Sequence, residues 1–252
     1  MKHWMILAAG LTLTLPAHAI DWNELLKGVV NQPSSQPATQ PAASGVDALS
    51  STEINAGLKE ALNRGADVAV AQLGQKDGFF GNTQLRIPLP PTLKKAEKGM
   101  RLLGMGKQAD DLVLSMNRAA EAAVPEAKTL LVDAVKAMTL EDAKGILTGG
   151  KTSATDFFRN KTEARLTERF APVVKANTDK VGLAQQYNRY AGAAAQFNLI
   201  DKKQAKVEDY VTQQALDRLY NLIGEKEAAI RANPMQAGSD LLKKVFGAVS
   251  GK

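Results

Sequence analysis

The sequence predicts an all-α fold: a single domain of about eight or nine helices that follows a cleaved signal peptide and a flexible tether. Apolar residues recur at helical spacing through almost all of the chain after residue 50. Alternating β-branched runs are nearly absent, and the closest one, residues 85–90, contains two prolines. Residues that start or stop helices stand between the periodic segments.

The helices can be placed from their start and stop residues. Ser50 and Glu53 match a capping box, in which each side chain bonds the backbone of the other, so a helix follows and ends near Gly74. Pro91 is acceptable in the first turn of the next helix, and Pro125 restarts or kinks a later one. The later helices are predicted at residues 91–104, 107–123, 125–138, 140–147, 155–177, 183–197, 207–232 and 239–246.

Residues 1–19 have the layout of a secretory signal peptide. Lys2 supplies the positive charge, residues 4–15 form the apolar stretch, and Ala17 and Ala19 are the small residues of a cleavage site. The apolar stretch is shorter than the roughly 20 residues of a membrane span, which argues against the alternative of a retained anchor. No cysteine follows the cleavage site, so a lipoprotein is not expected. The predicted location is the periplasm of a Gram-negative bacterium.

The mature chain divides into three parts. Residues 20–48 hold a short amphipathic segment with Trp22, and then a linker rich in Pro, Gln and Ser that has too few large apolar residues to fold alone. Residues 49–247 form the predicted helical domain, and residues 248–252 form a tail. No segment after the signal peptide is apolar enough to predict a transmembrane span.

The composition excludes several classes of enzyme and metalloprotein. The chain has no cysteine, and both histidines, His3 and His18, lie in the predicted signal peptide. The mature protein would therefore lack a cysteine nucleophile, a Ser-His-Asp triad and any Cys or His ligand for a metal. We predict no metal site and no cofactor. Any catalysis would depend on carboxylate, hydroxyl, Lys, Arg or Tyr groups.

Residues 145–152, GILTGGKT, match the pattern of a phosphate-binding P-loop. A true P-loop follows a buried strand, whereas a helix is predicted before this segment. The simpler interpretation is that one helix ends at Gly149 and Gly150 and that Thr152 caps the next.

The irregular stretch 78–91 is the first candidate binding element, because long loops on a helical scaffold often carry binding residues. Phe79 and Phe80 are adjacent and cannot both face one core, so Phe80 is a candidate for ligand contact. Arg86 can hold a carboxylate or phosphate with its planar guanidinium. In the alternative, Phe79 and its apolar neighbours cover helix ends, and Arg86 pairs with a helix C-terminus.

The helix after this stretch is the most basic part of the chain, and only Glu97 offsets its charge. Its candidate binding residues are Lys94, Lys95, Lys98 and Arg101, and Lys107 follows them. Such a run could meet anionic lipid head groups, lipopolysaccharide or another acidic envelope polymer. A solvated helix face is the alternative.

A further set of candidates consists of polar residues within otherwise apolar helical patterns. They are Asn117, Arg118, Glu121, Asp156 and Arg159. Asp156 and Arg159 lie one turn apart and can pair locally. If the charged members converge, a buried carboxylate with a raised pKa could act as an acid or base. The alternative is a structural ion-pair network.

Several long segments occur in a characteristic order. They are LSSTEINAGLKEALNRGADVAVAQLGQKDGFFGN, LRIPLPPTLKKAEKGMRLLGMGK, MNRAAEAAVPEAKTLLVDAVKAMTLEDAKGILTGG, TDFFRNKT, DKVGLAQQYN and DYVTQQALDRLY. Together they closely resemble an exported bacterial family, the domain of unknown function 4197, over nearly all of residues 49–247. The resemblance implies a helical periplasmic or envelope-associated domain and no activity. Lys151 departs from the family pattern, where an acidic residue is expected.

We therefore expect a binding or interaction module of the cell envelope. The formal net charge is +6, and cleavage of the signal peptide removes one lysine. This positive charge favours an anionic envelope component as the partner, with another envelope protein as the alternative partner. Nucleic acid is not expected as a partner. The alternative is an enzyme that uses Asp/Glu and Arg without His, Cys or metal. A dimeric role for residues 239–246 is a third option.

Overall fold

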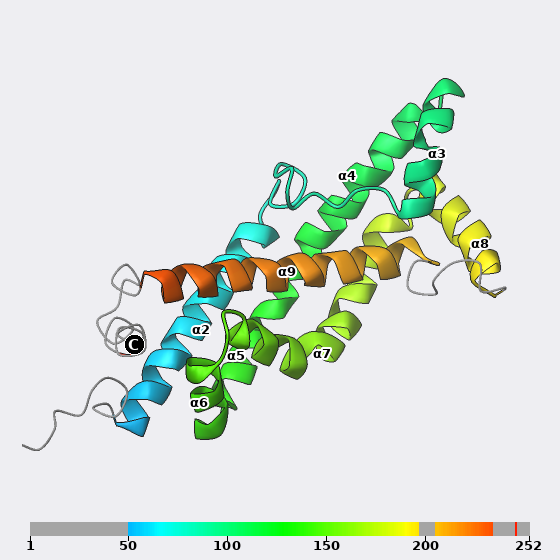
Figure 1. The fold of residues 1–252 in the computed structure, drawn as a ribbon. Coiled ribbons are helices and arrows are strands. Elements are labelled where there is room, and N and C mark those ends of the chain that lie inside the picture. The colour runs from blue at the N-terminus through cyan, green and yellow to red at the C-terminus, as the bar shows by residue number, and fades with distance from the viewer. Residues whose placement is uncertain (1–49, 197–204, 234–244, 246–252) are drawn as a thin grey trace, which may run out of the picture. The chain divides into compact units, whose positions relative to one another are not determined.

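The computed structural model describes residues 50–196, 205–233 and 245, and in these residues it confirms the all-α fold (Figure 1). The helices are α2 (Ser51–Gly74), α3 (Pro91–Leu102), α4 (Gly106–Ala123), α5 (Ala127–Lys136), α6 (Leu140–Thr148), α7 (Ser153–Thr178), α8 (Gly182–Gln196) and α9 (Val207–Ala232). None of these described helices is long and apolar enough to cross a membrane. The predicted signal peptide, the tether, most of the helix predicted at 239–246 and the tail lie outside the described residues.

Most helix boundaries fall within two residues of those predicted. The capping box of α2 is confirmed: the Glu53 N–H donates to Ser50 Oγ at 3.1 Å, and the Ser50 N–H donates to Glu53 Oε2 at 3.0 Å. Pro125 lies in a short 3₁₀ turn, Val124–Glu126, that joins α4 to α5. α3 ends at Leu102, slightly earlier than predicted, because Gly104 adopts a left-handed conformation with φ +76°.

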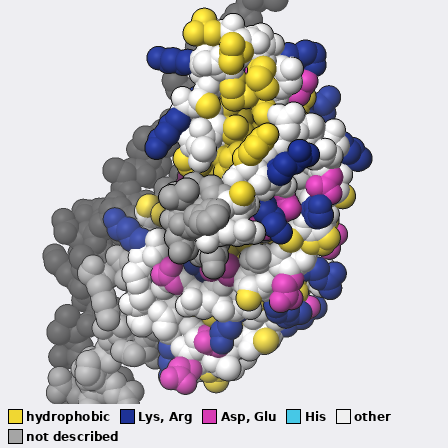
Figure 2. Space-filling model, turned by 90° about the vertical axis from the view of Figure 1, so that its right-hand side faces the viewer, with side chains coloured by type: hydrophobic (Ala, Val, Ile, Leu, Met, Phe, Trp, Pro, Cys, Tyr) yellow, Lys and Arg dark blue, Asp and Glu magenta, His cyan; other side chains and the backbone are white. Residues whose placement is uncertain are grey.

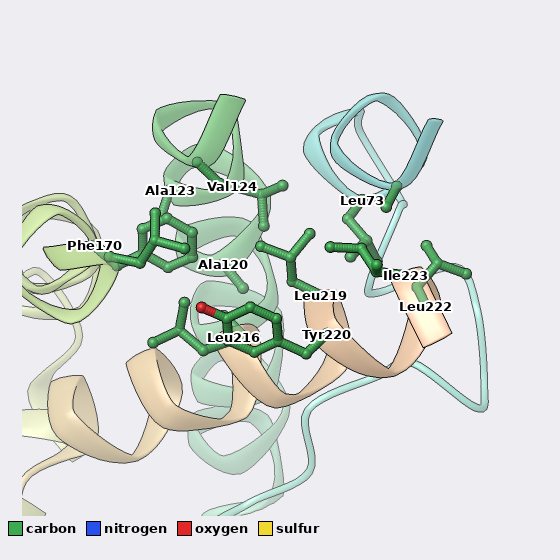
Figure 3. Close-up of a cluster of buried hydrophobic side chains, with 14 of the residues drawn as sticks. Leu73, Ala120, Ala123, Val124, Phe170, Leu216, Leu219, Tyr220, Leu222 and Ile223 are labelled. Atoms are coloured by element: carbon green, nitrogen blue, oxygen red, sulfur yellow. The ribbon is translucent and has the colours of Figure 1, made fainter. Parts of the chain in front are cut away.

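α9 supplies much of the core. It packs against α7, α2 and α4, and it crosses all three in Figure 1. Figure 3 shows Leu216, Leu219 and Tyr220 of α9 directed toward Ala120 of α4 and Phe170 of α7. All five side chains are completely buried. Alanine on α4 allows the helices to approach closely, while each large apolar side chain contributes about 1.5–3 kcal/mol by leaving water.

Tyr220 is the largest completely buried side chain in the described residues, and its one polar group is satisfied. Its hydroxyl lies 2.9 Å from Thr162 Oγ1, and the Arg159 guanidinium lies over its ring at 4.6 Å. Burial raises the pKa of the Tyr220 phenol to about 12, because a phenolate would lose its hydration in this environment.

The free energy of unfolding is expected to decrease above pH 10. The unfolded chain releases the Tyr220 proton near its ordinary pKa of 10.0, whereas the folded protein retains it until the pH approaches 12. The loss approaches about 1.4 kcal/mol per pH unit between these values. Urea unfolding of the wild type and Tyr220→Phe across this range measures it. The exposed Tyr190→Phe is the control. A difference between wild type and Tyr220→Phe that stays constant with pH would contradict the assignment.

Candidate functional site

The Glu121 carboxylate of α4 binds the backbone of the crossing loop, which we define as residues 75–90 between α2 and α3. The N–H groups of Phe79 and Phe80 each donate to Glu121 Oε1 at 3.1 Å. Arg118 Nη1 donates to Glu121 Oε2 at 2.6 Å, and its Nη2 donates to Asp77 Oδ1 at 2.7 Å. Glu121 is buried. The bonds that Arg118 donates to Glu121 and to Asp77 raise the pKa of the Arg118 guanidinium. Glu121 and Arg118 therefore position the loop.

Asn117, one turn before Glu121, binds the same loop further along. Its Oδ1 accepts the Ile87 N–H at 2.8 Å, and its Nδ2 donates to the Ile87 carbonyl at 2.9 Å. Nδ2 also donates to the Val113 carbonyl at 2.7 Å, within α4. The side chain is completely buried. Its amide thus pairs with Ile87 as the backbone of a neighbouring strand would.

The loop buries Phe79 and leaves Phe80 partly exposed, as the sequence predicted for adjacent phenylalanines. Arg86 and Arg118 both lie over the Phe80 ring, at 4.6 and 5.6 Å from its centre. Arg86 Nε donates to the Phe80 carbonyl at 2.8 Å, within the loop itself. This bond therefore differs from the alternative in which Arg86 pairs with a helix C-terminus, because its acceptor is a carbonyl of the loop.

Arg218 of α9 binds the loop as well. Its Nη2 donates to the Arg86 carbonyl at 3.2 Å, and its Nη1 donates to Gln214 Oε1 at 2.6 Å. Burial lowers the pKa of Arg218, because the charged guanidinium loses its hydration, and the charge of the neighbouring Asp217 opposes this effect only in part. A polar hollow of about 380 Å³ lies beside it, lined by residues of α2, the loop and α9.

A second buried carboxylate, Glu227 of α9, occupies the junction between α6 and α7. Its Oε1 accepts the Ala154 N–H at 2.9 Å, and its Oε2 accepts the Thr155 N–H and hydroxyl, each at 3.0 Å. Arg231, one turn later, donates to Glu227 Oε1 and to the Ile146 carbonyl at the end of α6. This Glu227–Arg231 pair thus caps the start of one helix and the end of another.

The junction contains the segment that matches a P-loop, and the structure supports the simpler interpretation. α6 precedes the segment, and α6 ends at Thr148 with Gly149 after it. The first N–H groups of α7, which would bind phosphate in a P-loop, donate to the Glu227 carboxylate. Thr152 holds the predicted N-cap position, but its side chain makes no capping bond. Glu227 supplies the cap that the sequence placed on Thr152.

Asp156 and Arg159 of α7 do not form the predicted local pair. Asp156 accepts a bond from the Thr152 hydroxyl at 3.2 Å. Arg159 instead binds Glu163 at 3.3 Å and Asp217 of α9 at 3.2 Å. Of the four charged residues considered for convergence, the structure brings together Arg118 and Glu121. It gives Asp156 and Arg159 other partners.

The basic residues of α3 fall into two groups. Lys94 pairs with Glu97 at 2.7 Å, and Arg101 bridges Glu97 at 2.9 Å and Asp110 at 2.7 Å. The bonds from Lys94 and Arg101 lower the pKa of the Glu97 carboxyl. Lys107, at the start of α4, pairs with Asp111 at 2.7 Å. Lys95 and Lys98 are exposed and have no ion pair with any residue that the structure describes.

Apolar side chains are exposed at the end of α3 and on α8. Leu102 and Leu103, at the end of α3, are 88% and 80% exposed, and Tyr190 of α8 is 72% exposed. A hollow of about 420 Å³ lies between α3 and α8. Its lining is Thr92, Leu93, Leu183, Gln186, Tyr187, Tyr190 and Ala191. Figure 2 shows a strip of hydrophobic side chains at this end of the molecule, with Lys and Arg on both sides. We call this surface the α3–α8 face.

The family model described as Protein of unknown function (DUF4197) matches residues 48–247. The chain belongs to this family. No curated protein and no solved structure matches the DUF4197 chain.

The geometry separates the candidate residues of this DUF4197 protein into two kinds. Asn117, Arg118 and Glu121 bind the crossing loop, and Arg86 and Phe80 contact each other within it. The basic residues of α3 lie on an exposed surface. The described residues contain no group of three acidic or histidine side chains that could hold a metal. Glu227 and Arg231 were missed from the sequence, where they resemble an ordinary surface pair one turn apart.

Proposed function

We propose that this DUF4197 protein is a periplasmic or envelope-associated binding module that recognises an anionic envelope component through its α3–α8 face. The observation that carries the proposal is the pair Lys95 and Lys98, which project from α3 without a carboxylate partner in the described residues. The proposed location is supported by residues 1–19, which have the composition of a signal peptide.

The electrostatics of α3 support an anionic partner. Binding at Lys95 and Lys98 breaks no ion pair of the protein, so no internal contact has to be replaced. The neighbouring pairs of Lys94 and Arg101 are exposed, and such pairs contribute only about 0–1 kcal/mol each. These cations can therefore turn toward an external anion at little cost.

The alternative, an enzyme based on Asp/Glu and Arg, has less support from the contacts. Glu121 and Glu227 are buried carboxylates of the kind that catalysis would need, yet each already accepts two backbone N–H groups and an arginine. The oxygens of both carboxylates are therefore already occupied by structural donors of the protein, which leaves them poorly placed to act on a substrate.

Salt-dependent binding to a soluble polyanion tests the proposal. We expect the purified protein to bind immobilised heparin and the double variant Lys95→Gln/Lys98→Gln to bind on the order of tenfold or more weakly, since each lysine contributes about 1 kcal/mol near an anionic surface. The matched control is Lys144→Gln/Lys151→Gln, which removes two exposed lysines from and after α6. Equal elution of the two variants would contradict the assignment of the contact to α3.

A further inference from the structure

We propose that the α3–α8 face docks on the surface of an anionic lipid bilayer, with Leu102 and Leu103 inserted at the boundary between the head groups and the acyl chains. This inference rests on the proposed function and names its partner class. It requires three properties of the face: leucines held outward by the fold, further exposed apolar surface on α3 and α8, and cations on the same elements.

The two leucines are held outward by an ordered helix end. The Met105 N–H donates to the Met100 carbonyl at 2.8 Å, and the Gly104 N–H donates to the Arg101 carbonyl at 3.2 Å. This pattern, with Gly104 in the left-handed conformation, is a Schellman motif. It turns the chain directly after Leu103 and leads it into α4. Leu102 and Leu103 therefore project from a fixed corner, and their exposure does not come from a loose end.

Further apolar surface lies between α3 and α8. Leu93, at the other end of α3, lines the hollow that α3 forms with α8, together with Leu183 and the exposed Tyr190. Figure 2 shows hydrophobic side chains gathered on the surface at this end of the molecule. Exposed apolar patches rimmed by charge mark contact surfaces, and tyrosine is common at the boundary between lipid and water.

Cations lie on or next to these helices in positions that suit anionic head groups. Lys95 and Lys98 project from α3, and Lys180 lines an adjoining hollow of about 320 Å³ that shares Leu183 with the first. Lysine side chains can lay their apolar stems along lipid while the ammonium group reaches a phosphate. A basic amphipathic helix with exposed leucines is typical of proteins that lie on a bilayer. This charge pattern favours an anionic lipid surface as the occupant.

Partition to lipid vesicles tests the inference. We expect the purified protein to sediment with vesicles that contain phosphatidylglycerol and to remain in solution with vesicles of phosphatidylcholine alone. Leu102→Ser/Leu103→Ser should reduce this partition by about tenfold or more, because two inserted leucines are lost. Val68→Ser/Leu140→Ser, which replaces exposed apolar residues on α2 and α6, is the matched control and should partition as the wild type does.

Insertion can be observed directly, because the sequence has no cysteine and a single introduced thiol can be labelled. A polarity-sensitive fluorophore on Leu103→Cys should shift to the blue with phosphatidylglycerol vesicles, and the same label on Leu140→Cys should not shift.

The heparin experiment separates failure of this inference from failure of the proposed function. If heparin binding depends on Lys95 and Lys98 but the leucine variant partitions normally and the label does not shift, bilayer insertion is wrong and the anionic contact remains. If the lysine variant keeps full binding to both heparin and vesicles, the proposed function is wrong as well. Equal partition to both kinds of vesicle would also overturn the inference.

Discussion

Replacing Glu227 with alanine is expected to lower the free energy of unfolding by about 3–5 kcal/mol. The change leaves the buried N–H groups of Ala154 and Thr155 without an acceptor at the start of α7. It also removes the ion pair of Glu227 with Arg231, whose side chain is itself mostly buried. Both losses are large because a buried donor without an acceptor costs far more than an exposed one.

Urea unfolding followed by circular dichroism measures this change. Glu225→Ala is the matched control, because Glu225 lies on the same helix and is exposed. That variant should stay within about 0.5 kcal/mol of the wild type. Glu227→Gln separates charge from shape: its amide oxygen can still accept from α7, but its NH₂ group faces the Arg231 donors. An effect of Glu227→Ala no larger than that of Glu225→Ala would show that the cap contributes nothing to stability.

Replacing Glu121 with alanine is expected to cost about 2–4 kcal/mol and to loosen the crossing loop selectively. The N–H groups of Phe79 and Phe80 lose their shared acceptor, and Arg118 retains only the exposed Asp77 as an ion-pair partner in the described residues. Since Asn117 still holds Ile87, the disturbance should be greatest in the first half of the loop.

Amide hydrogen exchange provides the local measurement. In Glu121→Ala, exchange at residues 79 and 80 should accelerate more than exchange at Ile87. Asp111→Ala is the control on α4, because its pair with Lys107 is exposed and should contribute little. Uniform acceleration across the loop and α4 would mean that Glu121 supports the whole helix rather than the loop.

The helices were predictable because their signals are local. Ser50 and Glu53 lie three residues apart and bond each other directly, so the sequence contains the whole motif. A second capping box, Thr139 with Asp142 at the start of α6, has the same spacing. It could have been predicted from the sequence in the same way. The bond that the Thr139 backbone donates lowers the pKa of Asp142, as expected for a capping carboxylate.

The roles of the polar residues were predictable only in part. Asn117 and Glu121 stood out because they interrupt an apolar pattern on α4, and the pattern indicated burial. It did not indicate their partners, which are backbone groups of a loop about 30 to 42 residues away. A loop that crosses a helical core has no neighbouring strand, so its N–H groups depend on such side chains. Glu227 gave no signal, because its role arises only when α9 reaches the α6–α7 junction.

The residues that meet at that junction are synthesised at different times. Ala154 and the Glu227 that caps it are separated by 73 residues, so α6 and the start of α7 leave the ribosome several seconds before α9. During that interval the two helix ends lack the partners that the finished protein provides. A chain that stops short of Arg231 has made both helices but lacks the guanidinium that binds the Ile146 carbonyl at the end of α6. The last turns of α9 therefore supply the final bonds of this junction, so a truncation within them would leave both helix ends incompletely capped.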